Sequence, residues 1–291
     1  MKKAQFLKSL CLISLISLSI SVPQHSGQAA SNIPEEGEVI KILGRPSKQA
    51  LPNKRLKFLV WNLYKGSESS FAREFIYLGF TSDIIMAQEI FLDKKMSSVF
   101  KLLPQYLSTT ATSFFSGKDQ TRTGVANKSS VAPSSIDYLR TVVREPIVGT
   151  PKVTLITTYP IRYSDKKLTV VTIHAINFVS TSSFNLEMNR LYEKLKNLPK
   201  PMVFAGDFNT WNKDRMNILN EIAKKLDLKE ATFSPDNRMT FNGYPLDHFL
   251  YSDDLVIRSA KVEDWSKGSD HKPLQVEVEF KKESDQVALL N

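Results

Sequence analysis

The stretch from Met202 to Asn209 constrains the fold of this chain more than any other. Its first four residues, Met-Val-Phe-Ala, predict a short buried strand, and Gly206 lets the backbone approach another segment closely at the strand's end. Because side chains alternate along an extended backbone, Asp207 and Asn209 share one face while Phe208 points into the packing on the other. A carboxylate beside an amide suits a hard cation, or an oxygen nucleophile held next to one. A plain strand followed by an Asp/Asn turn is the alternative for this stretch alone.

Residues 1–30 form a separate segment with the features of a secretory signal peptide. Three lysines precede an apolar stretch over residues 10–22, and small residues follow it. This stretch is short and serine-rich for a membrane span, so we expect a secreted or periplasmic protein, with an N-terminal membrane anchor as the alternative. The only cysteine, Cys11, lies in this leader. The mature chain therefore lacks a thiol nucleophile, a disulfide and a thiolate zinc site.

The rest of the chain is long enough for one large domain with its own core. We predict a linker or edge segment over residues 31–54, one domain over residues 55–282, and a C-terminal tail over residues 283–291. The formal net charge is +9 at pH 7, and the chain stays basic without the leader. A basic chain favours phosphate-rich partners and anionic surfaces, although many exported proteins are simply basic.

Apolar runs and helical periodicities alternate along this domain, with strands in the majority. The apolar runs predict strands over residues 57–62, 83–89, 152–159, 168–174, 202–207, 245–251, 255–262 and 274–280. Helical spacing predicts helices over residues 71–79 and 184–198, and shorter ones near residues 96–103 and 218–226. Residues 106–150, rich in Ser, Thr and Gly, indicate short strands joined by loops. The pattern favours two sheets packed face to face with helices outside.

Polar side chains stand at the ends of five predicted strands in otherwise apolar surroundings. They are Asn62, Gln88-Glu89, His174 with Asn177, Asp207 with Asn209, and Asp247-His248. A turn, Gly268 to Pro273, leads into the last strand and carries Asp270 and His271. Three of the four histidines lie in these segments, which a random distribution would not favour.

This ordered set of segments resembles the motifs of the endonuclease/exonuclease/phosphatase superfamily, the DNase I-like group of metal-dependent phosphoesterases. The motifs are Trp61-Asn62, Gln88-Glu89, His174-x-x-Asn177, Gly206-Asp207-Phe208-Asn209, Leu246-Asp247-His248 and Ser269-Asp270-His271-x-Pro273. The resemblance extends from about Leu56 to Phe280 and is greatest to a compact bacterial subgroup of unassigned substrate. It implies an α/β fold, a four-layer sandwich of two mixed sheets with helices outside.

The resemblance also implies a divalent-metal site. Glu89 would bind the catalytic cation, and Asn62 and Asp270 would complete or support its coordination shell. Carboxylate, amide and water ligands without a thiolate favour Mg²⁺ or Mn²⁺ over zinc.

The same resemblance assigns catalytic roles to five further residues. Asp207 would orient or deprotonate the attacking water, and Asn209 would hold that water or a phosphate oxygen. His271, oriented by Asp247, would act at the scissile phosphate. His174 would protonate the leaving oxygen or stabilise charge. Imidazole suits these tasks because it titrates near neutral pH.

The function implied is an exported, metal-dependent phosphodiester hydrolase, expected to be monomeric, with nucleic acid as the first substrate on grounds of charge. A phospholipid or sphingomyelin phosphodiesterase, with transient membrane contact, and a small-molecule phosphatase are the enzymatic alternatives. No obvious long hydrophobic hairpin suggests entry into a membrane. A non-catalytic binding module is the alternative of another class.

Several residues near the motifs admit two interpretations. His248 follows Asp247 on a strand, so we expect it to face the opposite side and to pack there. Three aromatic residues suit the core or a site wall better than base stacking: Trp61, Phe178 and Trp211. Six cations form either a phosphate-tracking rim or an ordinary solvated surface: Lys118, Arg122, Lys213, Arg215, Lys267 and Lys272.

Overall fold

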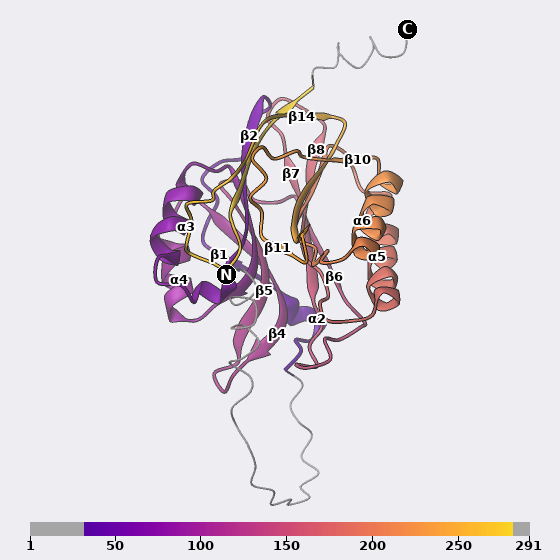
Figure 1. Ribbon diagram of the computed structural model, residues 1–291. Helices are drawn as coiled ribbons and strands as arrows, with labels where there is room; N and C mark the ends of the chain where they lie inside the picture. The colour runs from indigo at the N-terminus through magenta and orange to yellow at the C-terminus, as the bar shows by residue number, and fades with distance from the viewer. Residues whose placement is uncertain (1–31, 282–291) are drawn as a thin grey trace, which may run out of the picture.

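The computed structural model describes residues 32–281 of the chain. Two β-sheets pack face to face, and pairs of helices cover their outer faces (Figure 1). The expected four-layer α/β sandwich is therefore confirmed. The leader over residues 1–30 and the tail over residues 283–291 lie outside the described residues. Among residues 32–281, no helix is long and apolar enough to cross a membrane.

The first sheet contains seven strands in the order β1-β4-β5-β3-β2-β15-β14. Strands β2 and β3 run parallel, and the other neighbours run antiparallel. Strand β1 is an edge strand, so part of segment 31–54 belongs to this sheet. The seven strands are β1 (Ile40–Leu43), β2 (Arg55–Asn62), β3 (Ile84–Phe91), β4 (Leu107–Ser116), β5 (Thr121–Ser129), β14 (Leu255–Val262) and β15 (Leu274–Phe280).

The second sheet contains six strands in the order β10-β13-β9-β8-β7-β6. Here β8 and β9 run parallel and the rest run antiparallel, so both sheets are mixed. The six strands are β6 (Ser135–Arg140), β7 (Val153–Pro160), β8 (Lys167–His174), β9 (Met202–Asp207), β10 (Leu228–Glu230) and β13 (Asp247–Ser252). A separate two-stranded ribbon pairs β11 (Thr240–Phe241) with β12 (Tyr244–Pro245).

The helices lie in pairs on the two outer faces (Figure 1). Helices α3 (Phe71–Phe80) and α4 (Lys94–Lys101) cover the seven-stranded sheet, and α5 (Thr181–Leu195) and α6 (Lys213–Lys225) cover the six-stranded one. Helix α5 begins three residues before the predicted start because the Ser180 side chain caps it, accepting a hydrogen bond from the Ser183 amide. Two short helical segments complete the chain, α2 (Glu36–Val39) and η1 (Tyr64–Gly66).

Alternation along the strands decides which face of the sheet each side chain occupies. On β2, Phe58 and Val60 belong to the core between the sheets, whereas Leu59 and Trp61 belong to the core under α3 and α4. Asn62 therefore ends β2 on the inner face. The central strand β9 follows the same rule: Val203 and Ala205 lie in the inner core, which puts Asp207 on that face too. Phe204 and Phe208 pack beneath α5 and α6, so the predicted packing of Phe208 is confirmed.

The expectation of short strands over residues 106–150 was wrong, because β4 and β5 span ten and nine residues. Most of their threonines and serines are buried strand residues, and the link from β5 to the facing sheet is made by Asn127. Asn127 on β5 donates to Thr157 Oγ1 at 2.8 Å, and its oxygen accepts a hydrogen bond from the Thr172 hydroxyl. β-Branched threonine is favoured in strands, so a polar composition does not exclude a long strand. The hydrogen bonds between the sheets are not visible in the composition.

Candidate active site

The register of three neighbouring strands places three site residues side by side. On the six-stranded sheet, Asp207 of β9 pairs with His174 of β8 on one side and with Asp247 of β13 on the other. On the facing sheet, Asn62 of β2 pairs with Gln88 of β3. These ends of the five strands meet at the same end of the inner core. The site is thus a consequence of strand pairing, which local sequence patterns do not encode.

Asp207 is the residue around which the site is built. Its Oδ2 accepts a hydrogen bond from Asn62 Nδ2 at 3.0 Å, and lies 3.5 Å from His174 Nε2 and 3.8 Å from His271 Nε2. Its Oδ1 accepts from the backbone amide of Asn209 at 2.9 Å. Burial raises the pKa of Asp207 to about 7; the nearby charge of Asp247 adds to that shift and the imidazolium of His271 opposes it. Asp207 therefore titrates near neutral pH.

His271 and Asp247 form a buried pair beside Asp207. His271 Nδ1 donates to Asp247 Oδ2 at 2.7 Å, and its backbone carbonyl accepts from Trp61 Nε1 at 3.1 Å. Burial lowers the pKa of His271, but the carboxylates of Asp247, Asp207 and Asp270 outweigh it and hold that pKa well above its usual value. The other oxygen of Asp247 is buried and has no hydrogen-bond partner among residues 32–281.

His174 has the opposite electrostatic character to His271. Burial lowers its pKa well below the usual value, and the positive charges of Lys152, His271 and Lys65 lower it further. One imidazole of the site is therefore charged near pH 7 and the other is neutral.

A β-bulge turns Glu89 into the site. The register between β3 and β5 shifts between Ala87 and Ile90, and Glu89 has a left-handed backbone with φ of +50°. Its Oε1 then lies 4.0 Å from His174 Nε2 and 3.5 Å from Asn62 Nδ2. The carboxylate thereby faces the pocket, although strict alternation from Gln88 would have directed it away from the inner face.

Gly206 is required where β8 and β9 meet. Its φ is +139°, and an added Cβ would stand 2.1 Å from the carbonyl oxygen of Ile173, well inside contact distance. The close backbone approach expected at this glycine is therefore confirmed. Asn209 also has a positive φ, +52°, which asparagine tolerates better than most residues, and its Nδ2 donates to Ala175 O at 3.0 Å.

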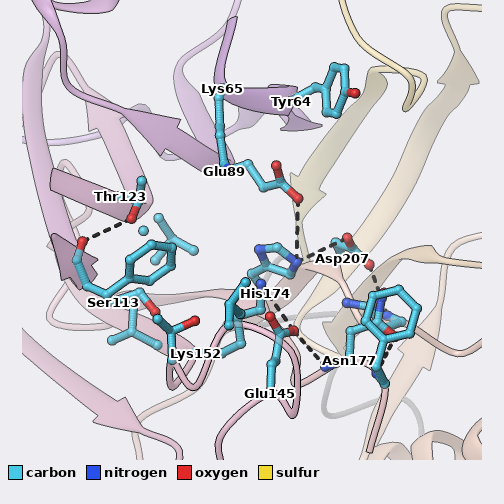
Figure 2. A pocket seen from close by; sticks show the side chains of 18 of the residues that line it. Tyr64, Lys65, Glu89, Ser113, Thr123, Glu145, Lys152, His174, Asn177 and Asp207 are labelled. Carbon is cyan, nitrogen blue, oxygen red and sulfur yellow. Dashed lines mark hydrogen bonds and ion pairs between the residues drawn. The ribbon is translucent and has the colours of Figure 1, made fainter. Parts of the chain in front are cut away.

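The structure brings all eight predicted site residues together. Six of them line one pocket of about 230 Å³: Glu89, His174, Asp207, Asn209, Asp270 and His271. The other two lie behind it, with Asn62 bonded to Asp207 and Asp247 bonded to His271. Figure 2 shows the carboxylates of Glu89 and Asp207 both directed toward the same ring nitrogen of His174. Burial raises the pKa of Asp270, and the negative charge of Glu89 contributes to the shift.

The donor set fits a hard cation. Glu89 and Asp270 supply carboxylate oxygens at the pocket surface. Asn62 supports them from behind, because its Nδ2 faces Glu89 Oε1 at 3.5 Å and its Oδ1 accepts from the Tyr64 amide at 3.1 Å. Asp207, Asp247 and His271 also have ligand-type atoms within 4.8 Å of one another. However, the Nδ1 of His271 already bonds to Asp247, so this trio is better described as a hydrogen-bonded group beside the metal-binding carboxylates.

Two of the secondary expectations need correction. His248 faces the side opposite to Asp247, as expected, but it is more than a packing residue: its Nδ1 bonds to Glu230 Oε1 at 2.6 Å and its Nε2 to Thr210 Oγ1 at 2.7 Å. Arg215 is fully buried, not part of a basic rim, and its guanidinium donates to the carbonyls of Asn209, Ile176 and Val179. The sequence of α6 does not indicate that Arg215 is buried.

Sequence patterns missed two charged residues at the pocket, Glu145 and Lys152. Glu145 accepts a hydrogen bond from the Asn177 amide at 3.0 Å and forms an ion pair with Lys152 at 3.3 Å. Asn177 in turn accepts from Trp211 Nε1 at 2.9 Å. Trp61 fills the core, whereas Phe178 is partly exposed and lines the pocket. Glu145 and Lys152 lie in a loop region where no periodic pattern distinguishes them.

The layers, the strand orders and the pocket at the strand ends define a DNase I-like α/β sandwich. A model of the endonuclease/exonuclease/phosphatase family matches residues 59–271, and the chain belongs to this family. Members of the family are typically metal-dependent hydrolases of phosphoric esters.

Individual relatives agree with this assignment. A UPF0294 protein of Vibrio parahaemolyticus is 30% identical over 278 residues, which cover 92% of this chain and 94% of that protein. Among solved structures, a family member from Leptotrichia buccalis is similar with a TM-score of 0.57 at 17% identity, covering 77% of this chain and all of that one. The human Nocturnin catalytic domain is similar with a TM-score of 0.58 at 17% identity, and the match covers 83% of this chain and 97% of that domain.

Proposed function

We propose that this protein is a divalent-metal-dependent phosphodiester hydrolase. The observation that carries the proposal is the environment of Asp207: a buried carboxylate with a pKa of about 7, between a charged and a neutral histidine. Such a group accepts a proton efficiently near neutral pH. The neighbouring carboxylates of Glu89 and Asp270 add the acidic donors that a hard cation requires.

Glu89, Asp270 and Asn62 would hold Mg²⁺ or Mn²⁺. When bound, the cation supplies positive charge that stabilises the extra negative charge on the phosphate oxygens. The oxygen-only donor set supports these ions over softer ones.

The chain's own groups have complementary tasks in this proposal. Asp207 accepts the proton of the attacking water, and the Asn209 amide fixes the carboxylate by bonding to its Oδ1. The His271 imidazolium, kept charged by Asp247, faces the phosphate and stabilises its charge. His174 is neutral near pH 7, so it would donate a hydrogen bond to the phosphate or leaving oxygen and would not serve as a strong acid.

The net charge of +9 supports nucleic acid as the first substrate class to test. Monomeric function and an exported location, secreted or periplasmic, belong to the same proposal. The exported location rests on the sequence of residues 1–30 alone, and an N-terminal membrane anchor is its alternative.

The experiment measures hydrolysis of bis(p-nitrophenyl) phosphate and nicking of supercoiled plasmid by the purified protein. Activity is expected with Mg²⁺ or Mn²⁺ and should be abolished by a chelator. Asp207→Ala should lose at least a hundredfold, whereas Asp119→Ala, a change in an exposed turn, should retain the activity. Failure to hydrolyse both of these substrates and phospholipid vesicles, with either metal, would overturn the proposal in favour of a binding module.

A further inference from the structure

The pocket extends well beyond the catalytic residues. At one end lie Glu89, His174 and Asp207, and at the other end the wall is formed by the β4–β5 hairpin and by the loop between β6 and β7 (Figure 2). Phe114 and Val125 come from the hairpin. This second end is not needed to bind a phosphate group, so its lining indicates what is attached to the phosphate.

The loop between β6 and β7 contributes exposed aliphatic side chains to the rim. Ile147 is 61% exposed and Val148 is 49% exposed, and both line the pocket. Single exposed aliphatic residues are ordinary on protein surfaces. Together with Phe114 and Val125 in the wall, these two consecutive residues give this end of the pocket an apolar lining beside the Glu145–Lys152 ion pair.

Most hydrogen-bonding groups in this second end already have partners. Glu145 and Lys152 line it as an ion pair at 3.3 Å, and Glu145 also accepts a hydrogen bond from the Asn177 amide at 3.0 Å. The Ser113 hydroxyl donates to Pro151 O at 2.5 Å, and the Thr123 hydroxyl donates to Phe114 O at 2.9 Å. Thr150 also lines the pocket, is more than nine-tenths buried, and has a hydroxyl without a partner among the described residues. A nucleobase has several polar edge groups, and each one left unpaired on burial costs about 1–3 kcal/mol. An apolar group with a single oxygen acceptor matches this lining better.

The charges near the rim are also suited to a membrane surface. Arg144 is exposed in the same loop as Ile147 and Val148, and exposed Lys65 lines the pocket on the opposite side. Cations interspersed with exposed aliphatic side chains are typical of surfaces that bind anionic lipid. In contrast, none of the six described cations predicted as a phosphate-tracking rim lines the pocket, and Arg215 is buried.

We propose that the second end of the pocket is a subsite for the glycerol-ester region of a phospholipid, which makes a phospholipid phosphodiester in an anionic membrane the substrate. This inference rests on the proposed hydrolase function. Ile147 and Val148 contact the acyl region, Thr150 donates to an ester carbonyl, and the phosphate lies beside Asp207. The oxygen of water forms a new bond to phosphorus, one phosphoester bond breaks, and the released alkoxide takes up a proton.

The test compares two substrates at equal Mg²⁺ concentration. The first is vesicles of phosphatidylcholine and phosphatidylglycerol, scored by release of a headgroup or a phosphorylated headgroup; the second is soluble bis(p-nitrophenyl) phosphate. The double variant Ile147→Asp/Val148→Asp is expected to lower the ratio of vesicle to soluble-substrate hydrolysis at least tenfold, and to weaken cosedimentation with vesicles. Leu186→Asp, a similarly exposed leucine on α5, should leave that ratio as in wild type.

The outcomes separate this inference from the function on which it rests. Hydrolysis of the soluble diester with intact vesicles, or plasmid cleavage with a higher kcat/KM than lipid hydrolysis, overturns the phospholipid assignment and leaves the hydrolase proposal standing. An unchanged ratio in the double variant overturns the role of the loop. Failure to hydrolyse any of the three substrates overturns the hydrolase proposal itself.

Discussion

Asp207 and Asp247 face each other across β9 and β13, and the imidazole of His271 contacts both carboxylates. The bond to Asp247 is short, 2.7 Å from Nδ1 to Oδ2, whereas Nε2 stands 3.8 Å from Asp207. The buried cation therefore depends mainly on Asp247, and it in turn reduces the repulsion between the two acids. The effects of Asp247 and Asp207 on His271 can therefore be distinguished by replacing each carboxylate in turn.

Replacing Asp247 with Asn should lower the pKa of His271. The variant removes the negative charge that most raises this pKa while burial, which lowers it, remains. In metal-free protein, NMR should show that His271 loses its proton at a lower pH in the variant than in wild type. His271→Gln identifies the resonance. As pH rises, hydrolysis by Asp247→Asn should decline at a lower pH than hydrolysis by wild type, because the imidazolium is lost earlier. Identical titrations of His271 in the two proteins would contradict the role given to Asp247.

Replacing Asp207 with Asn should stabilise the metal-free fold while abolishing activity. The pKa of Asp207 is about 7 in the folded protein against an ordinary 3.8, so the folded state binds the extra proton between these values. The free energy of unfolding therefore falls as pH rises through this range, by on the order of 1–4 kcal/mol. Chemical denaturation with chelator should show Asp207→Asn gaining stability over wild type between pH 5 and pH 8. A similar gain in stability over wild type in Asp119→Asn would point to a general charge effect.

Much of the architecture could be predicted from sequence because apolar periodicity records burial. Most of the eight site residues are recognisable because they stand at or near the ends of apolar runs, whereas Asp270 and His271 lie in the turn before the last strand. Alternation predicts which face Asn62 and Asp207 occupy. Glu89 is different: its direction depends on a β-bulge that no local pattern indicates.

The parts that sequence could not predict depend on long-range contacts. Arg215 looks like any helix cation, yet it is buried because three carbonyls from two loops converge on its guanidinium. The polar strands β4 and β5 are stable because Asn127 meets Thr157 and Thr172 of the facing sheet. Pairings across 30 or more residues of sequence are not visible in composition.

Replacing Gly206 with Ala should destabilise the fold through a clash as well as through backbone strain. The new Cβ would stand 2.1 Å from Ile173 O at a φ of +139°. We expect a loss of at least about 3 kcal/mol in the free energy of unfolding. Gly117→Ala is the matched control, because Gly117 also has a positive φ, +69°, but nothing lies within 4 Å of an added Cβ. A loss in Gly206→Ala no larger than in Gly117→Ala would show that β8 and β9 adjust to the side chain.

Lys128 gives the fold a pH dependence that is independent of the active site. Its side chain is buried on β5, where Nζ donates to Ser108 Oγ at 2.6 Å and stands 4.4 Å from the centre of the Phe100 ring. Burial lowers its pKa from 10.5 to about 7. Above pH 7 the folded state therefore holds a neutral amine while the unfolded state stays protonated up to about 10.5. Unfolding takes up a proton in this window, so this residue's contribution to stability rises with pH across it.

Lys128→Met should accordingly be more stable than wild type at pH 6 to 7, by on the order of a few kcal/mol, with an advantage that shrinks toward pH 10. The loss of the bond to Ser108 adds a constant offset that does not change with pH. The measurement is urea denaturation of both proteins at several pH values. The difference between their free energies of unfolding reports on Lys128, because the contributions of groups common to both proteins cancel. A difference that stays flat from pH 7 to pH 10 would mean that Lys128 titrates at its ordinary pKa in the folded protein.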